Sequence, residues 1–314
     1  MNDAVLVEGL SKSFGTTKAV RDVSLSVQSG ELFGFIGPDG AGKTTLFRIL
    51  ATLLLPDTGR AEVLGVDVAK GLWQLRPRLG YMPGRFSLYP DLSVEENLRF
   101  FAAVFGTSLE KEYEQIAPIY VQLEAFKGRR AGALSGGMKQ KLALCCALVH
   151  RPDILFLDEP TTGVDAVSRR EFWELLAKFK EAGLTIVVST PYMDEATRCD
   201  RVALMQGGRI LAIDAPDAIT QAFDRPLLAV RADQRYDSLL ALREYPNTHT
   251  VYPFGEALHY TDARATLPVE SVSREVVAFL ESRGLTAVSA GAIPASIEDS
   301  FMAYLGTAEE APNA

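Results

Sequence analysis

Cysteine and histidine are both scarce in this sequence. The 314 residues include three histidines and three cysteines, Cys145, Cys146 and Cys199. No CxxC spacing and no partner histidine motif accompanies the cysteines. We therefore expect buried free thiols in a reducing compartment rather than a cysteine-based metal or redox site.

Long apolar runs are also missing. No stretch reaches the roughly 18 apolar residues that a membrane-spanning helix requires, and runs such as 142–149 are much shorter. The first ten residues contain Asp3 and Glu8, which does not fit a signal peptide. If the protein works at a membrane, we expect another chain to supply the membrane spans.

The chain also has no excess of basic residues over acidic ones. The chain has 32 Lys and Arg against 40 Asp and Glu, for a formal net charge of −8. Proteins that bind DNA or RNA usually present a basic face. No nucleic-acid partner is therefore expected.

The remaining composition is typical of a folded protein with two domains. Hydrophobic residues make up 47% and charged residues 23%, as in ordinary globular proteins. Strand-like and helix-like segments alternate over 1–217, which predicts an α/β domain with a mainly parallel sheet. The mostly helical stretch 79–149 is predicted to be an inserted subdomain. Residues 226–306 are predicted to form a small α+β domain, and 307–314 a disordered tail.

The individual elements are predicted from apolar periodicity and turn residues. The predicted strands of the larger domain are 5–7, 23–27, 32–36, 62–63, 154–157, 185–189 and the hairpin 202–205 with 209–213. Its clearest predicted helices are 43–54, 95–105, 113–126 and 167–181. The smaller domain is predicted in the order strand 227–230, helix 238–243, strands 250–252 and 257–260, helix 272–283, strand 286–289 and helix 297–305.

A glycine-rich loop lies between the predicted strand 32–36 and the helix that follows it. The stretch GPDGAGKT at 37–44 fits the pattern GxxxxGK[ST], in which backbone N–H groups and a helix N-terminus surround phosphates. Lys43 is expected to reach the β- and γ-phosphates of ATP, and the Thr44 hydroxyl to ligate Mg²⁺. The candidate nucleotide-binding residues of this loop are Gly37, Asp39, Gly40, Ala41, Gly42, Lys43, Thr44 and Thr45.

Two carboxylates follow the apolar strand 154–157. Asp158 at the strand end is a candidate to hold Mg²⁺ through water. Glu159 is the candidate catalytic residue, because its carboxylate can orient or deprotonate an attacking water. Taken alone, the segment could also be a buried strand that ends in an acidic turn.

A third motif, LSGGMKQ at 134–140, precedes a long helix. Ser135, Gly136 and Gly137 are placed to meet a phosphate at the helix N-terminus. The simpler interpretation is a serine N-cap followed by flexible glycines.

These motifs in this order resemble the ABC ATPase family over about residues 4–214. Phe14, in SKSFG, resembles the aromatic residue that stacks on adenine in that family, and Asp165, in TTGVDAVSRR, resembles the loop that meets a partner ATPase. The resemblance implies a head-to-tail pair in which each ATP lies between the phosphate loop of one chain and the signature Ser135–Gly137 of the other. It also implies a multi-spanning membrane permease as partner and a peripheral position at the cytoplasmic face of the cell membrane.

Two positions depart from the family pattern. Gly84 stands where the family usually has Gln, and Pro191 where it usually has His. Glycine offers only backbone, and proline offers neither a side-chain donor nor a backbone N–H. One preorganised donor typically contributes about 10²–10³ to the rate. We therefore hypothesise that this chain binds ATP but hydrolyses it slowly at its own site. Its signature motif would complete a more active ATP site on a second ABC ATPase. A homodimer in which Glu159 sustains slow hydrolysis is the rival.

Two further segments carry expectations from the resemblance alone. Residues 86–98 are expected to receive the permease, with an apolar face formed by Phe86, Leu88, Tyr89 and Pro90. The ending 294–302 resembles the tail of ATPases that serve ABC-2 type exporters, and the small domain is expected to be regulatory or dimer-stabilising.

Two other functions remain open. One is a non-hydrolysing scaffold gated by ATP, which Gly84 and Pro191 favour. The other is a soluble ABC ATPase of DNA repair or translation, although the chain has no long coiled-coil insertion, second ATPase domain or basic arm.

Overall fold

The computed structural model describes residues 3–310 and divides into two units, Met1–Pro216 and Asp217–Ala314. Each unit has its own sheet or sheets and its own hydrophobic core. The two are described separately below.

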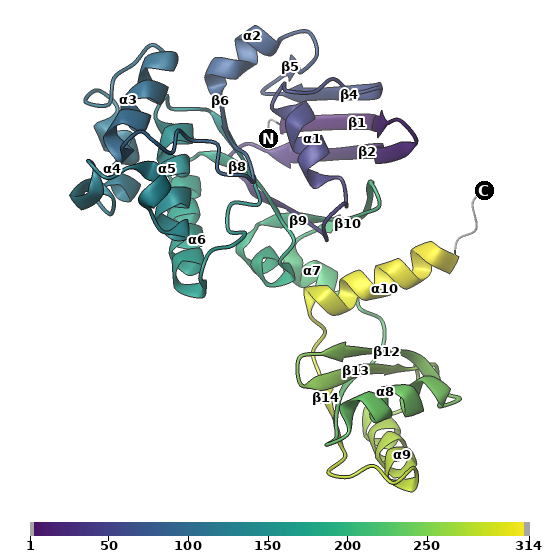
Figure 1. Ribbon diagram of the computed structural model, residues 1–314. Helices are drawn as coiled ribbons and strands as arrows, with labels where there is room; N and C mark the ends of the chain where they lie inside the picture. Colours follow the sequence, from purple (N-terminus) through teal and green to yellow (C-terminus); the bar gives the residue numbers. More distant parts are fainter. Residues whose placement is uncertain (1–2, 311–314) are drawn as a thin grey trace. The chain divides into compact units, whose positions relative to one another are not determined.

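The first sheet of the larger unit has four antiparallel strands in the order β2-β1-β4-β5 (Figure 1). Its strands are β1 (Asp3–Phe14), β2 (Thr17–Gln28), β4 (Thr58–Val63) and β5 (Val66–Asp67). The inward face of this sheet is apolar, with Val5, Val7 and Leu10 fully buried. It covers one side of the core shared with the second sheet.

The second sheet has six strands in the order β10-β9-β3-β8-β7-β6. Its strands are β3 (Leu32–Ile36), β6 (Leu79–Met82), β7 (Ile154–Asp158), β8 (Thr185–Thr190), β9 (Arg201–Gln206) and β10 (Arg209–Asp214). All are parallel except β10, which returns antiparallel to β9. The parallel strands therefore bring their carboxyl ends to one edge, where loops from distant parts of the chain meet.

The strands β3, β7 and β8 are buried at every position. Strands covered on both faces are continuously apolar rather than alternating, which is why the runs 32–36 and 154–157 stand out in the sequence. Edge-to-face contacts link Phe33, Phe35, Phe47 and Phe156 at centroid distances of 5.2–5.9 Å. This aromatic row connects the strands to the first helix.

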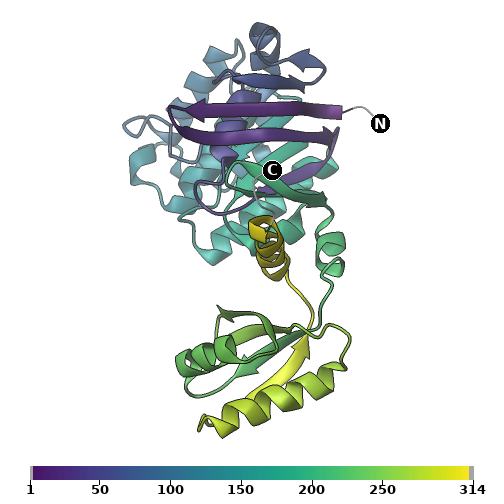
Figure 2. The same ribbon diagram turned by 90° about the vertical axis from the view of Figure 1, so that its right-hand side faces the viewer.

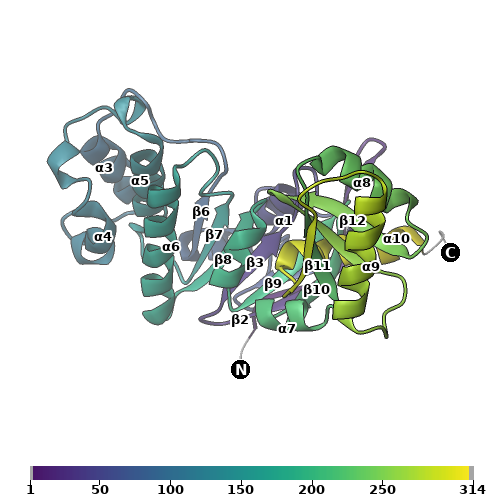
Figure 3. The same ribbon diagram turned by 90° about the horizontal axis from the view of Figure 1, so that it is seen from below.

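The helices of the larger unit are α1 (Lys43–Leu50), α2 (Leu72–Leu75), α3 (Val94–Val104), α4 (Tyr113–Tyr120), α5 (Gly136–Leu148) and α6 (Ala166–Glu181). Its 3₁₀-helices are η1 (Arg76–Arg78), η2 (Glu124–Phe126), η3 (Ala131–Ala133) and η4 (Met193–Arg198). Figure 3 shows α3, α4 and α5 gathered at one side of the unit, beside α6. They are the inserted helical part that the sequence predicted.

The smaller unit has one antiparallel sheet, in the order β12-β13-β11-β14. Its elements are α7 (Pro216–Gln221), β11 (Leu227–Arg231), α8 (Arg235–Glu244), β12 (Thr248–Phe254), β13 (Ala257–Asp262), α9 (Val269–Ser282), β14 (Ser289–Ile293) and α10 (Ile297–Glu310). Leucines and valines of α8 and α9 pack with Leu228, Val230, Leu258 and Tyr260 of the sheet, so both helices cover one face (Figure 2).

The predicted α/β class with a mainly parallel sheet is confirmed, and the predicted order of elements in the smaller unit matches the structure. Several predicted bounds differ from the structure. The helix predicted at 113–126 ends at Tyr120, and the separate 3₁₀-helix η2 covers Glu124–Phe126. The helix predicted to reach residue 54 ends at Leu50, since Thr52 has a left-handed backbone (φ +61°). The strand predicted at 286–289 lies at Ser289–Ile293. Residues 307–310, predicted as the start of a disordered tail, continue α10, and 311–314 lie outside the described residues.

Candidate active site

The glycine-rich loop runs from the buried end of β3 to the start of α1. A side chain at Gly37 would place its Cβ 2.2 Å from the Met205 carbonyl oxygen, and one at Gly42 would place it 2.2 Å from that of Ala19. Gly42 also has φ +103°, a conformation that glycine adopts without strain. The backbone at these two positions is therefore too confined for any other residue, and the loop keeps the narrow path that a phosphate-binding loop needs.

Lys43, the first residue of α1, points back over this loop. Its Nζ donates to the carbonyl oxygens of Gly37 (2.7 Å) and Pro38 (3.0 Å), and only 3% of the residue is exposed. The same Nζ lies 3.3 Å from Glu159 Oε1. The structure thus brings the loop lysine and the candidate catalytic carboxylate together from positions 116 residues apart in the numbering.

Thr44 lies beside Asp158 at the end of β7. Its Oγ1 donates to Asp158 Oδ1 at 3.1 Å. Ser189 Oγ donates to the same carboxylate oxygen at 2.7 Å. Asp158 is 2% exposed, so these hydroxyls stabilise a carboxylate that has little access to water.

Ser189 was not among the predicted site residues. It lies on β8 directly opposite Asp158 in the parallel register. Its carbonyl oxygen and its Oγ also accept from Glu159 N, at 3.0 and 3.1 Å. Only the strand pairing reveals this role, because the sequence shows merely a serine near the end of an apolar run.

Glu159 has a left-handed backbone (φ +51°), which is uncommon for a residue with a side chain. The two contacts from Ser189 hold it there. Thr162 Oγ1 lies 3.5 Å from Glu159 Oε2. The side chain keeps 21% of its surface exposed, so a water molecule can approach the carboxylate.

The other predicted loop residues occupy different environments. Asp39 and Gly40 are exposed, and Ala41 is buried and accepts from Gly208 N at 3.0 Å. Thr45 is half-buried in the first turn of α1. Phe14, at the end of β1, is 51% exposed, and Lys12 Nζ lies 5.8 Å from its ring centroid. An exposed ring of this kind is available for stacking.

The signature motif forms the N-terminus of α5. Ser135 is the N-cap, and its Oγ accepts from Met138 N at 3.4 Å. Gly137 packs against α6, where an added Cβ would lie 2.6 Å from Ser168 Oγ. Within residues 3–310, no hydrogen bond or ion pair joins this motif to the phosphate loop. Both the N-cap interpretation and a role toward another chain are compatible with this geometry.

Asp165 is the N-cap of α6. Its Oδ1 accepts from the backbone N–H groups of Val167 (3.1 Å) and Ser168 (3.0 Å). Hydrogen bonds from Ser168, first of all from its backbone N–H, lower the pKa of Asp165. The loop that carries this residue is therefore fixed at the start of a long helix.

Both departures from the family pattern follow the strands that flank β7, Gly84 after β6 and Pro191 after β8, at the same edge of the sheet as the acid pair. A Cβ at Gly84 would be 3.0 Å from the Asp158 carbonyl oxygen and 3.7 Å from Glu159 Cβ. Pro191 follows Thr190, whose carbonyl oxygen accepts from Gly37 N at 3.3 Å. Residue 191 therefore follows a strand end that contacts the phosphate loop through Thr190 and the acid pair through Ser189.

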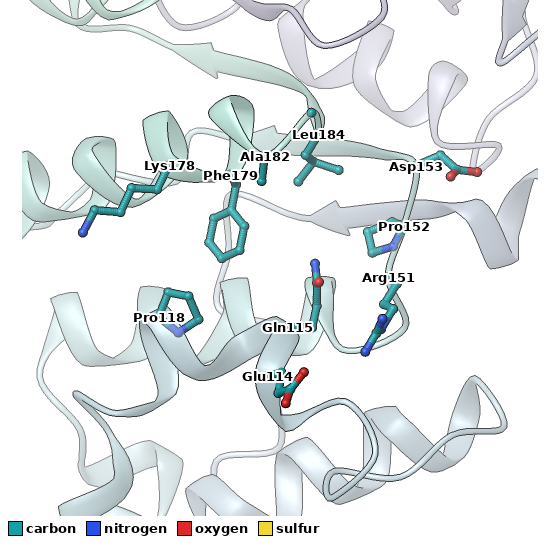
Figure 4. A pocket seen from close by; sticks show the side chains of 11 residues that line it. Glu114, Gln115, Pro118, Arg151, Pro152, Asp153, Lys178, Phe179, Ala182 and Leu184 are labelled. Carbon is teal, nitrogen blue, oxygen red and sulfur yellow. The ribbon is translucent and has the colours of Figure 1, made fainter.

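A cavity of about 470 Å³ lies elsewhere in the same unit (Figure 4). It is lined by α4, by residues 151–153 before β7, and by the end of α6. These segments precede β7 and β8, whereas the phosphate loop and the acid pair follow parallel strands. The cavity is thus at the opposite edge of the sheet and belongs to no predicted site.

The residues present fit a nucleotide with Mg²⁺. The threonine hydroxyl and aspartate oxygen are the hard oxygen ligands that Mg²⁺ prefers, usually with phosphate oxygens and water. Among residues 3–310, no group of three or more His, Cys, Asp and Glu could hold a metal by itself.

The three cysteines are free and buried as predicted, and burial raises the pKa of each thiol. Within residues 3–310, none of the helices combines the length and the apolar composition of a membrane-spanning helix.

Comparisons with known proteins agree with this geometry. A sequence model of the ABC transporter family matches residues 20–162. The chain is 34% identical to the Nod factor export ATP-binding protein I of Ralstonia nicotianae over 306 residues, which cover 96% of this chain and 93% of that relative. It is 45% identical to the probable multidrug ABC transporter ATP-binding protein YbhF of Escherichia coli over 210 residues, 66% of this chain but 36% of the length of YbhF.

Solved structures show the same fold. One is cbiO1 from Clostridium perfringens, part of the ABC transporter complex cbiONQ, with a TM-score of 0.64, 26% identity, and coverage of 71% of this chain and 92% of that chain. Another is a dimeric ATP-binding cassette in a post-hydrolysis state bound to ADP and Pi, with a TM-score of 0.61, 25% identity, and coverage of 67% and 98%. The chain therefore belongs to the ABC transporter ATP-binding proteins, a family of ATP-hydrolysing enzymes built on the P-loop α/β fold.

Proposed function

We propose that this chain is the ATP-binding subunit of an ABC exporter, of the ABC-2 type, at the cytoplasmic face of the membrane. The observation that carries the proposal is the convergence of Lys43, Thr44, Asp158 and Glu159 at the ends of β3 and β7. The relative named for Nod factor export supports the direction of transport. A multi-spanning permease and a second ABC ATPase subunit are the partners of this proposal.

The geometry supports the following task for each residue of the proposed site. Lys43, in place of its present loop carbonyl partners, would bind the β- and γ-phosphates of ATP. Backbone N–H groups of Gly40–Thr45 would bind the remaining phosphate oxygens, and Phe14 would stack on the adenine. Glu159, held beside Lys43 with part of its surface exposed, would orient the attacking water or accept its proton.

Thr44 and Asp158 would hold Mg²⁺. The ion would neutralise charge that develops on the phosphates. Ser189 binds the same Asp158 oxygen as Thr44, so it would keep the carboxylate oriented whichever ligand Thr44 contacts.

We further propose that the site built on this chain's own phosphate loop is degenerate. Gly84 and Pro191 lie against the acid pair and beside the phosphate loop, yet neither offers a side-chain donor. The signature Ser135–Gly137 has the expected residues. This asymmetry favours a heterodimer in which the chain binds ATP firmly and completes the partner's site.

A second candidate function is a non-hydrolysing, ATP-gated scaffold. The same two positions favour it, because transition-state donors matter for turnover and much less for ground-state binding. Steady ATP turnover that depends on Glu159 would separate the exporter motor from this scaffold.

The first test is MgATP binding by the full-length chain, with Lys43→Ala as the variant. Removing the ammonium group that faces the phosphates is expected to weaken binding about 10- to 100-fold, since charge-assisted hydrogen bonds contribute about 1.5–3 kcal/mol. Equilibrium binding of a fluorescent ATP analogue measures it. Arg48→Ala on the same helix, one turn beyond the loop, is the control. Equal affinity of the Lys43→Ala variant and the native chain would contradict the proposed site.

An apolar groove is the proposed docking surface for the permease. It has a volume of about 440 Å³ and includes Trp73 (77% exposed), Val104 (61%) and Phe105 (36%). Ser87 and Leu88 of the predicted contact segment also line it. Leu88 is buried, so it forms part of the groove wall and not of an exposed face, while Tyr89 is 47% exposed and packs edge-on against Phe100.

A charge in this groove should weaken assembly without affecting nucleotide binding. Val104→Asp is expected to lower affinity for permease-containing membranes about 30-fold, because a central apolar contact is worth about 2 kcal/mol. Co-sedimentation with those membranes measures the loss. Val121→Asp is the matched control, as Val121 is also 61% exposed and lies outside the groove. Equal losses for the two variants would mean that the groove is not the docking surface.

A further inference from the structure

A buried carboxylate outside the proposed acid pair lies where several functional segments meet. Glu195, on η4, is 3% exposed. Its Oε1 accepts from Thr161 Oγ1 at 2.8 Å, and its Oε2 accepts from Thr190 Oγ1 at 2.5 Å. Both threonines are also buried, at 1% and 0% exposed. Each oxygen of the carboxylate is thus bound to a different strand-end turn.

The two threonines belong to the segments that carry the proposed chemistry. Thr161 comes two residues after Glu159, and Thr190 directly precedes Pro191. The Thr190 carbonyl oxygen also accepts from Gly37 N of the phosphate loop at 3.3 Å. Glu195 therefore connects the turn after the acid pair to the turn where the family's side-chain donor is absent.

Arg169 extends the cluster to a third segment. Its Nε lies 3.9 Å from Glu195 Oε1, its Nη2 lies 3.8 Å from Asp194 Oδ2, and its guanidinium lies 4.9 Å from the Tyr192 ring centroid. The backbone N–H of Arg169 donates to the Asp165 carbonyl oxygen at 2.9 Å. The loop that carries Asp165 is therefore tied to the same cluster.

Filling space does not account for this arrangement. A buried carboxylate is costly unless it is hydrogen-bonded, and an apolar side chain of similar volume is often equally stable or more so. What the carboxylate does provide is a pair of directed hydrogen bonds to two separate turns. Those bonds fix the turns relative to each other.

A shift of the Thr190 turn would be transmitted to Glu159. Ser189, the neighbour of Thr190, accepts from Glu159 N through both its carbonyl oxygen and its hydroxyl. Thr161, which follows Glu159 in the chain and donates to Glu195 Oε1, restrains the turn after the acid pair in the same way. The orientation of Glu159 thus depends on contacts that Glu195 holds in place.

We propose that Glu195 is a positioning residue for ATP hydrolysis. It fixes the turn after the acid pair against the turn at Pro191, and so orients Glu159 at a site where residue 191 has no side-chain donor. The proposal rests on the proposed function, because it requires hydrolysis at the site of Glu159.

The test compares Glu195→Ala with Glu195→Gln in the full-length chain. Equilibrium binding gives the Kd for MgATP, and single-turnover hydrolysis with protein in excess over ATP gives the chemical rate. Glu195→Ala is expected to slow hydrolysis about 10- to 100-fold, the effect of a misplaced catalytic group, with the Kd within about twofold of native. Glu195→Gln should recover most of the rate, because its amide can accept from one threonine and donate to the other.

Glu112→Ala is the matched control. Glu112 is also a buried carboxylate (5% exposed), bound to the Thr107 hydroxyl at 2.7 Å and to Arg151, but it precedes α4 in the helical part. It should lose stability without losing rate. Equal rate losses in Glu195→Ala and Glu112→Ala, or a native rate in Glu195→Ala, would overturn the inference.

Two further outcomes separate this inference from the proposed function. If the native chain binds no MgATP, the proposed function fails. If it binds MgATP but gives no single turnover, nucleotide binding stands and the positioning role is overturned.

If Glu195→Ala does not fold, Thr190→Val and Thr190→Ser replace it. The inference then requires that only the valine variant, which lacks the hydroxyl, hydrolyses ATP slowly.

Discussion

Glu159→Gln is expected to lower ATP turnover by about 10²–10⁴-fold, the usual contribution of a positioned general base. Gln has nearly the shape of Glu, so the left-handed backbone and the contacts from Ser189 should persist. What is lost is the negative charge beside Lys43 and the ability to accept a proton from water. Phosphate release under saturating MgATP measures the change, and binding of MgATP should be retained.

Glu174→Gln provides the control for this change. Glu174 forms an exposed i,i+4 pair with Arg170 on α6, at 3.8 Å, and the same substitution there should leave turnover unchanged. Turnover that is equal in Glu159→Gln and in the native chain would show that Glu159 does not catalyse hydrolysis. If both values are zero while MgATP binds, the ATP-gated scaffold becomes the better description of the chain.

Pro191→His is expected to raise turnover about 10- to 100-fold, part of the 10²–10³ that one preorganised donor contributes. The residue follows Thr190, which contacts the phosphate loop, and the preceding Ser189 contacts Glu159. An imidazole at this position can donate to a γ-phosphate and hold the Glu159 carboxylate. The gain should be partial, because Gly84 still supplies no side chain on the other side of the acid pair.

Pro191→Ala separates the imidazole from the loss of the proline ring. The alanine variant frees the backbone but adds no side-chain donor, so its turnover should stay near the native value. A similar gain in both variants would attribute the effect to backbone freedom. No gain in either would contradict the view that the missing donor limits the rate.

Position 191 is the better place for this experiment than position 84. A Cβ at Gly84 would be only 3.0 Å from the Asp158 carbonyl oxygen, so a glutamine there would have to displace either its own loop or the acid pair. Pro191 already carries a side chain. A histidine can therefore be introduced with less movement of the surrounding backbone.

The sequence by itself determined the fold class and the local motifs of this protein. The buried strands β3 and β7 are continuous apolar runs, and the confined loop needs glycine at 37 and 42. Local requirements of this kind can be recognised in the sequence, because each involves residues that are adjacent in the chain. The order of elements in the small unit followed from periodicity for the same reason.

Only the tertiary structure decided which side chains meet. Ser189 joins the acid pair because parallel pairing places it opposite Asp158, and Glu195 binds Thr161 and Thr190 because three turns converge at one edge of the sheet. Neither residue belongs to a spaced motif. Contacts between distant segments depend on strand order and register, and apolar periodicity, which records only the burial of each segment, does not specify them.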